Sequence, residues 1–155
     1  MAIGTLETLP QTERRTEQRF RMSYEAYLDW CDEDTHAEWV NGEVIVFMPP
    51  LLKHQYIVDF LLELLSLFNR LFDQGVLVSA PFEMRLFPGR ISREPDLLFV
   101  AREHLARLTE ERLDGPADLV VEVVSNSSTT RDRRDKFQDY QAGGVREYWI
   151  IDPRP

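Results

Sequence analysis

Two short apolar stretches decide the fold: Glu94-Pro95-Asp96-Leu97-Leu98-Phe99-Val100, and later Asp118-Leu119-Val120-Val121-Glu122-Val123-Val124. Runs of four to eight residues rich in Val and Leu predict strands that are buried on both faces. Each stretch carries one carboxylate within its apolar run, Asp96 in the first and Glu122 in the second. Burying a carboxylate is costly unless a partner or a metal ion compensates its charge. The two stretches therefore predict neighbouring strands whose carboxylates share a divalent cation.

Glu122 lies in the middle of its predicted strand, where its side chain points to the opposite face from Val121 and Val123. Lys136 follows in a segment that we expect to be helical, and it is one of only two lysines in the chain. An Asp, a Glu and a Lys that converge on one site suit metal-assisted hydrolysis of a phosphodiester. The lysine would orient the attacking water or stabilise negative charge in the transition state.

A simpler explanation exists for Lys136 alone. Asp132 and Lys136 are four residues apart with the acid first, which is the favoured order for an ion pair on a helix surface. On spacing alone, this pairing is the better explanation. Asp96 and Glu122 have no such simple explanation, because both interrupt apolar strands.

The order of the motifs resembles the Uma2 family (DUF820) of restriction endonucleases, which belongs to the PD-(D/E)XK nuclease superfamily. The resemblance runs from about Ser23 to the last residue. It rests on these residues: Pro95-Asp96, Val121-Glu122-Val123-Val124-Ser125, Asp132, Lys136, Tyr140 and Glu147-Tyr148-Trp149-Ile150-Ile151-Asp152-Pro153.

This resemblance implies an α/β fold with a restriction-endonuclease-like mixed β-sheet flanked by helices. It also implies an Mg²⁺-dependent DNA endonuclease in which Mn²⁺ can substitute. Asp96 and Glu122 would bind the ion, and the Val123 carbonyl would be a third protein ligand. The usual Glu-x-Lys pattern would place lysine at position 124, where this chain has Val124. Lys136 resembles a lysine that has migrated to the following helix.

Two further residues are candidates for the site. Asn41-Gly42 between apolar runs predicts a β-hairpin. The resemblance makes Glu38, shortly before that turn, an auxiliary acid near the metal, and an exposed glutamate at a strand end is an equal alternative. His54 resembles a family histidine that faces the active site, although a half-buried or capping histidine is the simpler interpretation.

The remaining pattern predicts two main helices packed on a sheet. Lys53–Asp73 is the longer helix, and we expect its apolar side chains, which recur at helical spacing, to be core. The other predicted helices are Tyr24–Cys31, Arg102–Leu108 and Arg131–Ala142. The other predicted strands are Val76–Ser79, Glu83–Phe87 and Glu147–Ile151, the last of them buried. We expect a turn at Pro88-Gly89 and a loop at Leu113–Pro116.

The length of 155 residues fits one domain, with a flexible arm at 1–22 and the nuclease-like domain at 23–155. The formal net charge of −9 argues against a general nucleic-acid coat protein and predicts weak, salt-sensitive DNA binding. Cys31 is the only cysteine, and no stretch resembles a signal peptide or a membrane span. These features predict a cytoplasmic protein without membrane contact. The chain ends just after a predicted buried strand, so we expect either a truncated chain or a partner that covers that surface.

Three functions fit the sequence. The first is a metal-dependent DNA endonuclease, which we expect to be a homodimer because cutting both strands requires two active sites. The second is a catalytically degenerate module of the same fold that binds DNA or protein, which Val124 and the acidic charge favour. The third is a hydrolase of a phosphate ester other than DNA.

Overall fold

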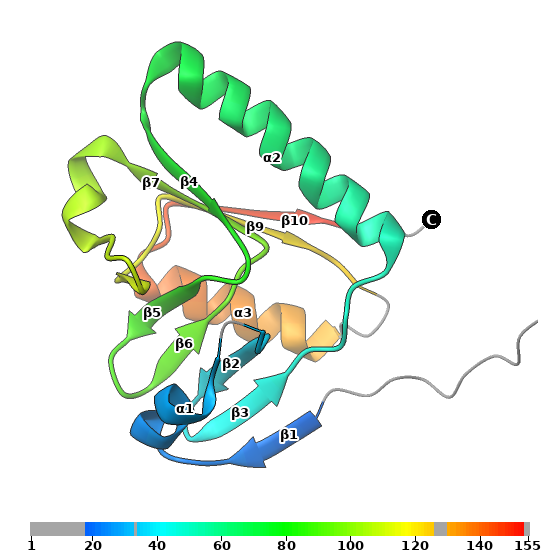
Figure 1. Cartoon of the computed structure of the whole chain (residues 1–155), viewed down its shortest axis with the longest axis vertical. Helices are drawn as coiled ribbons and strands as arrows, with labels where there is room; N and C mark the ends of the chain where they lie inside the picture. Colours follow the sequence, from blue (N-terminus) through cyan, green and yellow to red (C-terminus); the bar gives the residue numbers. More distant parts are fainter. Residues whose placement is uncertain (1–17, 33, 126–129, 154–155) are drawn as a thin grey trace, which may run out of the picture.

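The computed structural model describes residues 18–32, 34–125 and 130–153, without the side chains of residues 130–132. The chain folds into two β-sheets with helices on their faces (Figure 1). The expected α/β class with mixed sheets is confirmed, although the strands divide between two sheets instead of one. Most of the predicted N-terminal arm, the pairing of Asp132 and most of the polar loop after Ser125 lie outside the described residues.

The larger sheet has the order β1-β3-β2-β6-β5-β8. Its strands are β1 (Gln18–Arg21), β2 (Ala37–Val40), β3 (Glu43–Val46), β5 (Glu83–Phe87), β6 (Ile91–Arg93) and β8 (Arg112–Asp114). The predicted hairpin is present as β2 and β3, and its turn residues Asn41 and Gly42 both have positive φ. That conformation explains the Asn-Gly pair, because tight hairpin turns require positive φ at both central positions.

The smaller sheet has the order β10-β9-β7-β4. Its strands are β4 (Gly75–Ser79), β7 (Leu97–Ala101), β9 (Leu119–Val123) and β10 (Glu147–Ile151). β9 pairs in parallel with β10 and antiparallel with β7. The apolar stretches that follow Asp96 and that contain Glu122 are therefore neighbouring strands. The strand predicted across 118–124 is therefore confirmed.

The helices lie on both sheets: the N-terminal helix packs on the larger sheet, and the two long helices cover opposite faces of the smaller sheet (Figure 1). They are α1 (Tyr24–Trp30), α2 (Leu52–Phe72), the 3₁₀ helix η1 (Arg102–Arg107) and α3 (Thr130–Gly143). α2 packs on one face through a cluster that includes Val58, Leu97 and Val121. α3 lies on the other face and contacts β5 of the larger sheet, and its Tyr140 joins the main core between the sheets. No helix in the described ranges is long and apolar enough to cross a bilayer.

The alternation of β9 places Glu122 in the interior between the sheets. Val121 and Val123 pack toward α2, whereas Val120 joins the core that contains Tyr140. Glu122 shares the face of Val120, as the period of a strand requires. The predicted division of β9 into an apolar face and a face that carries the carboxylate is confirmed.

Several element predictions were wrong. Asp96 lies at a bend just before β7, not within a strand that begins at Glu94. The short strands β6 and β8 were missed, and β8 occupies much of the segment expected to be a loop. Gln18–Arg21 forms β1, although we expected it to belong to a flexible arm. β10 is an edge strand with exposed Trp149 and Ile150, so it is not buried within the described part of the chain.

α2 also differs from its prediction. One side of the helix packs on the sheet, but a second set of large apolar side chains faces outward. The exposed members are Leu52, Tyr56, Phe60, Leu64, Leu67, Phe68, Leu71 and Phe72. The helix therefore has two apolar faces, and only one of them belongs to the core.

The core assignment predicts a stability difference between two leucines. Leu98→Ala removes a side chain that is 1% exposed, and we expect it to lower the free energy of unfolding by about 3 kcal/mol. Leu51→Ala removes a side chain that is 62% exposed and should change it by less than about 0.5 kcal/mol. Urea denaturation of both variants measures the difference. Equal effects would contradict the assigned core.

Candidate active site

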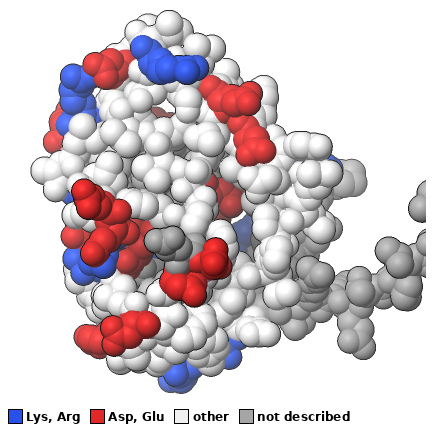
Figure 2. Space-filling model, viewed as in Figure 1, with Lys and Arg blue, Asp and Glu red and all other residues white. Residues whose placement is uncertain are grey.

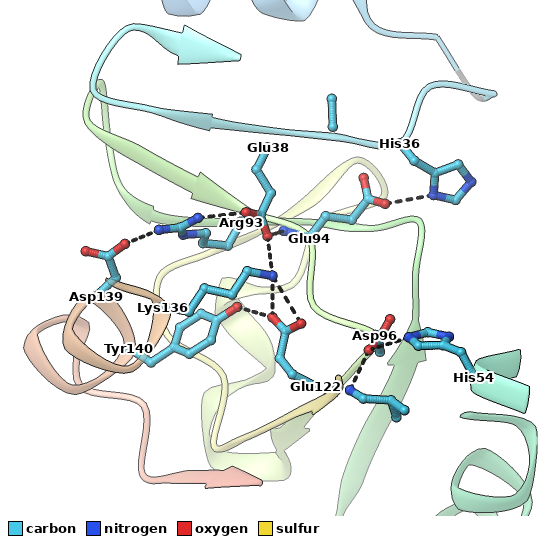
Figure 3. A network of polar contacts seen from close by, with 12 residues as sticks. His36, Glu38, His54, Arg93, Glu94, Asp96, Glu122, Lys136, Asp139 and Tyr140 are labelled. Atoms are coloured by element: carbon cyan, nitrogen blue, oxygen red, sulfur yellow. Dashed lines mark hydrogen bonds and ion pairs between the residues drawn. The ribbon is translucent and has the colours of Figure 1, made fainter. Parts of the chain in front are cut away.

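Glu122 is held by two side chains of α3. Lys136 Nζ lies 2.9 and 3.1 Å from the two carboxylate oxygens, and the Tyr140 hydroxyl donates a hydrogen bond of 2.7 Å (Figure 3). The spacing of four residues puts Lys136 and Tyr140 on one face of α3, which turns toward β9. Burial raises the pKa of Glu122, Lys136 opposes that rise, and the charge of Asp96 adds to it.

Lys136 bridges two carboxylates from different sheets. Its ammonium lies 3.0 Å from Glu38 on β2 and 2.9 Å from Glu122 on β9. Burial lowers the pKa of this lysine, but the two carboxylates outweigh burial and raise it above its usual value. Lys136 is therefore a fixed positive charge inside the protein, and the structure brings it together with Glu122 as the sequence predicted.

Glu38 is almost completely buried, with 1% of its surface exposed. It accepts a hydrogen bond of 2.7 Å from Arg93 Nη1 and one of 3.2 Å from the Glu94 backbone N–H. Burial raises the pKa of Glu38, but Lys136 and Arg93 prevail and lower it. Glu38 is thus an ionised member of the cluster, and the alternative of an exposed glutamate at a strand end is wrong.

Arg93 completes the network behind Glu38. Its guanidinium also pairs with Asp139 of α3, and only 4% of the residue is exposed. The sequence predicted no partner for Arg93 and no role for Asp139. Arg93 directly precedes the Glu94-Pro95-Asp96 motif and Asp139 directly precedes Tyr140, so proximity to the motifs was the available signal.

Asp96 has its own set of partners. One carboxylate oxygen accepts the Val123 backbone N–H at 2.7 Å and lies 3.3 Å from His54 Nε2 (Figure 3). The hydrogen bond with Asp96 raises the pKa of His54, against the effect of burial. His54 Nδ1 is buried and has no hydrogen-bond partner among the residues that the structure describes. His54 therefore faces the candidate site, as the family resemblance implied.

Glu94 is a further carboxylate at the site, and it was not predicted as a site residue. Its side chain contacts His36 Nδ1 at 3.0 Å, at the edge of the network in Figure 3. Burial and the nearby charge of Glu38 raise the pKa of Glu94 to about 8. That shift reflects burial first and the negative charge of the neighbouring carboxylates second.

The donor set fits a hard divalent cation. Five carboxylates surround the two fixed cations Arg93 and Lys136, which leaves an excess of negative charge; they are Glu38, Glu94, Asp96, Glu122 and Asp139. Within the described residues, no group of three His, Cys, Asp or Glu side chains is placed to hold a metal ion. Mg²⁺ needs no such group, because it binds through one or two carboxylates and keeps several waters. A soft metal such as Zn²⁺ would need more protein ligands.

A groove of about 380 Å³ lies between α3 and β10, lined by Arg133, Arg134, Phe137 and Ile150. It therefore combines two basic side chains with exposed apolar surface. Arg133 Nη1 lies 3.3 Å from Asp152. On the face shown in Figure 2, by contrast, acidic side chains gather on both sides of the hollow between the α2 layer and the larger sheet.

The buried network predicts a strong coupling between Arg93 and Glu38. Arg93→Met should lower the free energy of unfolding by about 3 kcal/mol, because it leaves a buried carboxylate with one cation fewer. Adding Glu38→Gln should recover part of that loss, since the double variant no longer buries the unpaired charge. Urea denaturation of the two single variants and the double variant measures the coupling. Additive losses would show that the two side chains act independently.

Comparison with known proteins identifies the family of the chain and a solved structure of similar fold. The family model "Uma2: Putative restriction endonuclease" matches residues 24–155. A solved structure from Anabaena variabilis ATCC 29413, described as a "putative nuclease belonging to DUF820", is similar at a TM-score of 0.71 and 15% identity, over 85% of this chain and 74% of that one. A search of curated proteins gives no match. The extent of the family match, together with the shared fold, shows that the chain belongs to the Uma2 family.

Proposed function

We propose that the protein is an Mg²⁺-dependent endonuclease that hydrolyses phosphodiester bonds in DNA. One observation carries the proposal. In the interior of a chain that belongs to the Uma2 family, the Lys136 ammonium contacts the Glu122 carboxylate, which is close enough to Asp96 to feel its charge. The lysine missing from position 124 is thereby replaced in space by one from α3. The simple surface pair of Asp132 and Lys136 does not account for Lys136, whose ammonium is buried between two carboxylates.

Asp96 and Glu122 would hold the metal ion, with the Val123 carbonyl as the third protein ligand. Mn²⁺ would substitute for Mg²⁺, because both accept oxygen ligands. When bound, the ion supplies a polarised phosphoryl oxygen and a bound water of lowered pKa. The hydrogen bond from the Val123 N–H already fixes the Asp96 carboxylate against β9, which supports a preformed site.

Lys136 would act as a charge, not as a base. Because its pKa is raised, it stays protonated at neutral pH and cannot accept a proton from water. Its ammonium can orient the attacking water and stabilise the negative charge that develops on the phosphoryl oxygens. The sequence allowed Lys136 either to orient the attacking water or to stabilise negative charge. Its two paired carboxylates keep the ammonium charged, which favours charge stabilisation.

Glu38, Arg93 and Tyr140 would be positioning residues. Glu38 holds Lys136 from the side opposite Glu122, and Arg93 holds Glu38 in turn. The Tyr140 hydroxyl donates a hydrogen bond to Glu122, which fixes the orientation of that carboxylate. These contacts keep the lysine in place without requiring the substrate to order it.

The substrate is held by local positive charge, since the whole chain carries a formal charge of −9. The groove of Arg133, Arg134 and Phe137 offers guanidinium groups for phosphates and an aromatic face for a base or sugar. It is formed by α3, the same helix that carries Lys136. We expect DNA binding through so few cations to be weak and strongly salt-dependent.

A second function has specific support. Both oxygens of Glu122 are within hydrogen-bond distance of Lys136, and one of them also accepts the Tyr140 hydroxyl. A carboxylate satisfied in this way would also suit a non-catalytic module of the same fold that binds DNA or protein. Metal-dependent nicking of plasmid DNA separates the two functions. Activity on a chromogenic phosphodiester without DNA cleavage would instead indicate a hydrolase of another phosphate ester.

The metal site predicts the effect of two isosteric substitutions. Asp96→Asn and Glu122→Gln should each abolish Mg²⁺-dependent nicking of supercoiled plasmid, because each removes a ligand charge. Both amides keep a carbonyl that can accept the native hydrogen bonds, so each variant should keep the wild-type fold by circular dichroism. EDTA should abolish the wild-type activity, and Mn²⁺ should restore it. Nicking at the wild-type rate by either variant would refute the assigned ligands.

Lys136→Met tests the migrated lysine separately. It should reduce nicking at least a hundredfold, because the charge that stabilises the transition state is lost, with a magnitude of the order seen for single electrostatic groups. Mn²⁺ affinity, measured by calorimetry, should be retained or increased, since a competing cation has left Glu122. Wild-type nicking by this variant would show that Lys136 only balances the buried carboxylates.

Arg134→Ala tests the groove. It should weaken DNA binding and reduce the slope of log K against log salt by about one, as the loss of one phosphate contact requires. Arg90→Ala, in the turn between β5 and β6, is the matched control and should leave the slope unchanged. Fluorescence anisotropy over a salt series measures both variants. An unchanged slope for Arg134→Ala would place the DNA elsewhere.

A further inference from the structure

The outward face of α2 carries eight of the fourteen large apolar side chains that are exposed in the described part of the chain. Its eight large apolar side chains are about half exposed or more, from 49% for Leu67 to 69% for Leu71. With side chains of this size, the exposed apolar area is roughly 800 Å². Monomeric proteins rarely expose continuous apolar patches larger than a few hundred Å².

The core does not require this face. α2 is held to the smaller sheet by a different set of side chains, namely Ile57, Val58, Leu61, Leu62 and Leu65. The helix also carries His54 inward, to Asp96. The outward side chains therefore serve neither the packing of α2 nor the candidate active site.

The spacing of the outward residues is that of a coiled-coil seam. Phe60, Leu64, Leu67 and Leu71 follow one another at intervals of four, three and four residues. Apolar residues at alternating intervals of three and four let two helices pack side by side along their length. The seam from Phe60 to Leu71 is roughly 16 Å long at the rise of an α-helix.

Charged residues on one flank of the seam are complementary to the same flank of a second copy. Glu63 and Arg70 lie one heptad apart, both exposed and both next to the seam. In an antiparallel pair, Phe60 lies opposite Leu71 of the second copy, and Leu64 lies opposite Leu67 of the second copy. This register brings Glu63 of each chain beside Arg70 of the other, so the twofold pair contains two such contacts. In a parallel pair, Glu63 of one chain would be level with Glu63 of the other, and Arg70 with Arg70. No opposite charges would therefore meet on that flank.

We propose that α2 is the dimerisation surface of this protein, and that a second copy of the chain packs antiparallel against it through Phe60, Leu64, Leu67 and Leu71. The exposed apolar area matches the roughly 800 Å² per partner that a standard interface buries. The proposal goes beyond the nuclease function and does not depend on it. If the protein does cut DNA, the dimer carries two active sites in one particle.

Sedimentation velocity over a concentration series tests the proposal on the full chain. We expect a dimer for the wild type at about 100 μM and a monomer for Leu67→Glu, because a charge in the middle of the seam cannot be buried. Leu28→Glu on α1 introduces the same charge at another half-exposed leucine and should remain a dimer. A wild-type monomer, or a Leu67→Glu dimer of unchanged affinity, would overturn the proposal.

A charge-reversal cycle tests the antiparallel register. Glu63→Arg and Arg70→Glu should each weaken the dimer about tenfold, because each places like charges together twice. The double variant should regain the wild-type dissociation constant. Circular dichroism confirms that each variant keeps its helix content. Failure of the double variant to regain affinity would refute this register, and none of these measurements depends on nuclease activity.

Discussion

The structure depends on the buried ammonium of Lys136. It lies between Glu38 on β2 and Glu122 on β9, and so links α3 to both sheets. Each carboxylate would be costly to bury alone, and the lysine compensates both at once. Arg93 also pairs with Glu38, and it pairs with Asp139 of α3. The interior between the sheets is therefore organised by charge as much as by apolar packing.

This arrangement would allow a protein of acidic composition to bind a phosphate, as the proposed function requires. Positive charge inside the protein acts at low dielectric, where it is worth far more than on the surface. Burial, together with the neighbouring carboxylates, raises the pKa of Glu94 and Glu122, and the excess of carboxylates around Lys136 leaves the cluster able to accept one more cation. A hard divalent ion next to Asp96 would meet that need and supply the chemistry that the family implies.

Much of this could be predicted from the sequence, because the decisive patterns are local. The alternation around Glu122 and the Asn41-Gly42 turn each specify their own element. Arg93 could not be predicted as a buried residue, because its partners are distant in the sequence and only the fold brings them together. β8 is too short to show a period, and the two apolar faces of α2 differ only in what packs against them.

The central claim is that Asp96 and Glu122 share a metal ion beside Lys136. Anomalous diffraction from a crystal soaked in Mn²⁺ tests it most directly, because the signal locates the ion without reference to activity. The account predicts one peak at about 2.2 Å from a carboxylate oxygen of each residue, with Lys136 still in contact with Glu38. A map without a peak at these carboxylates, or with Lys136 undisturbed on both oxygens of Glu122 at saturating Mn²⁺, would contradict it.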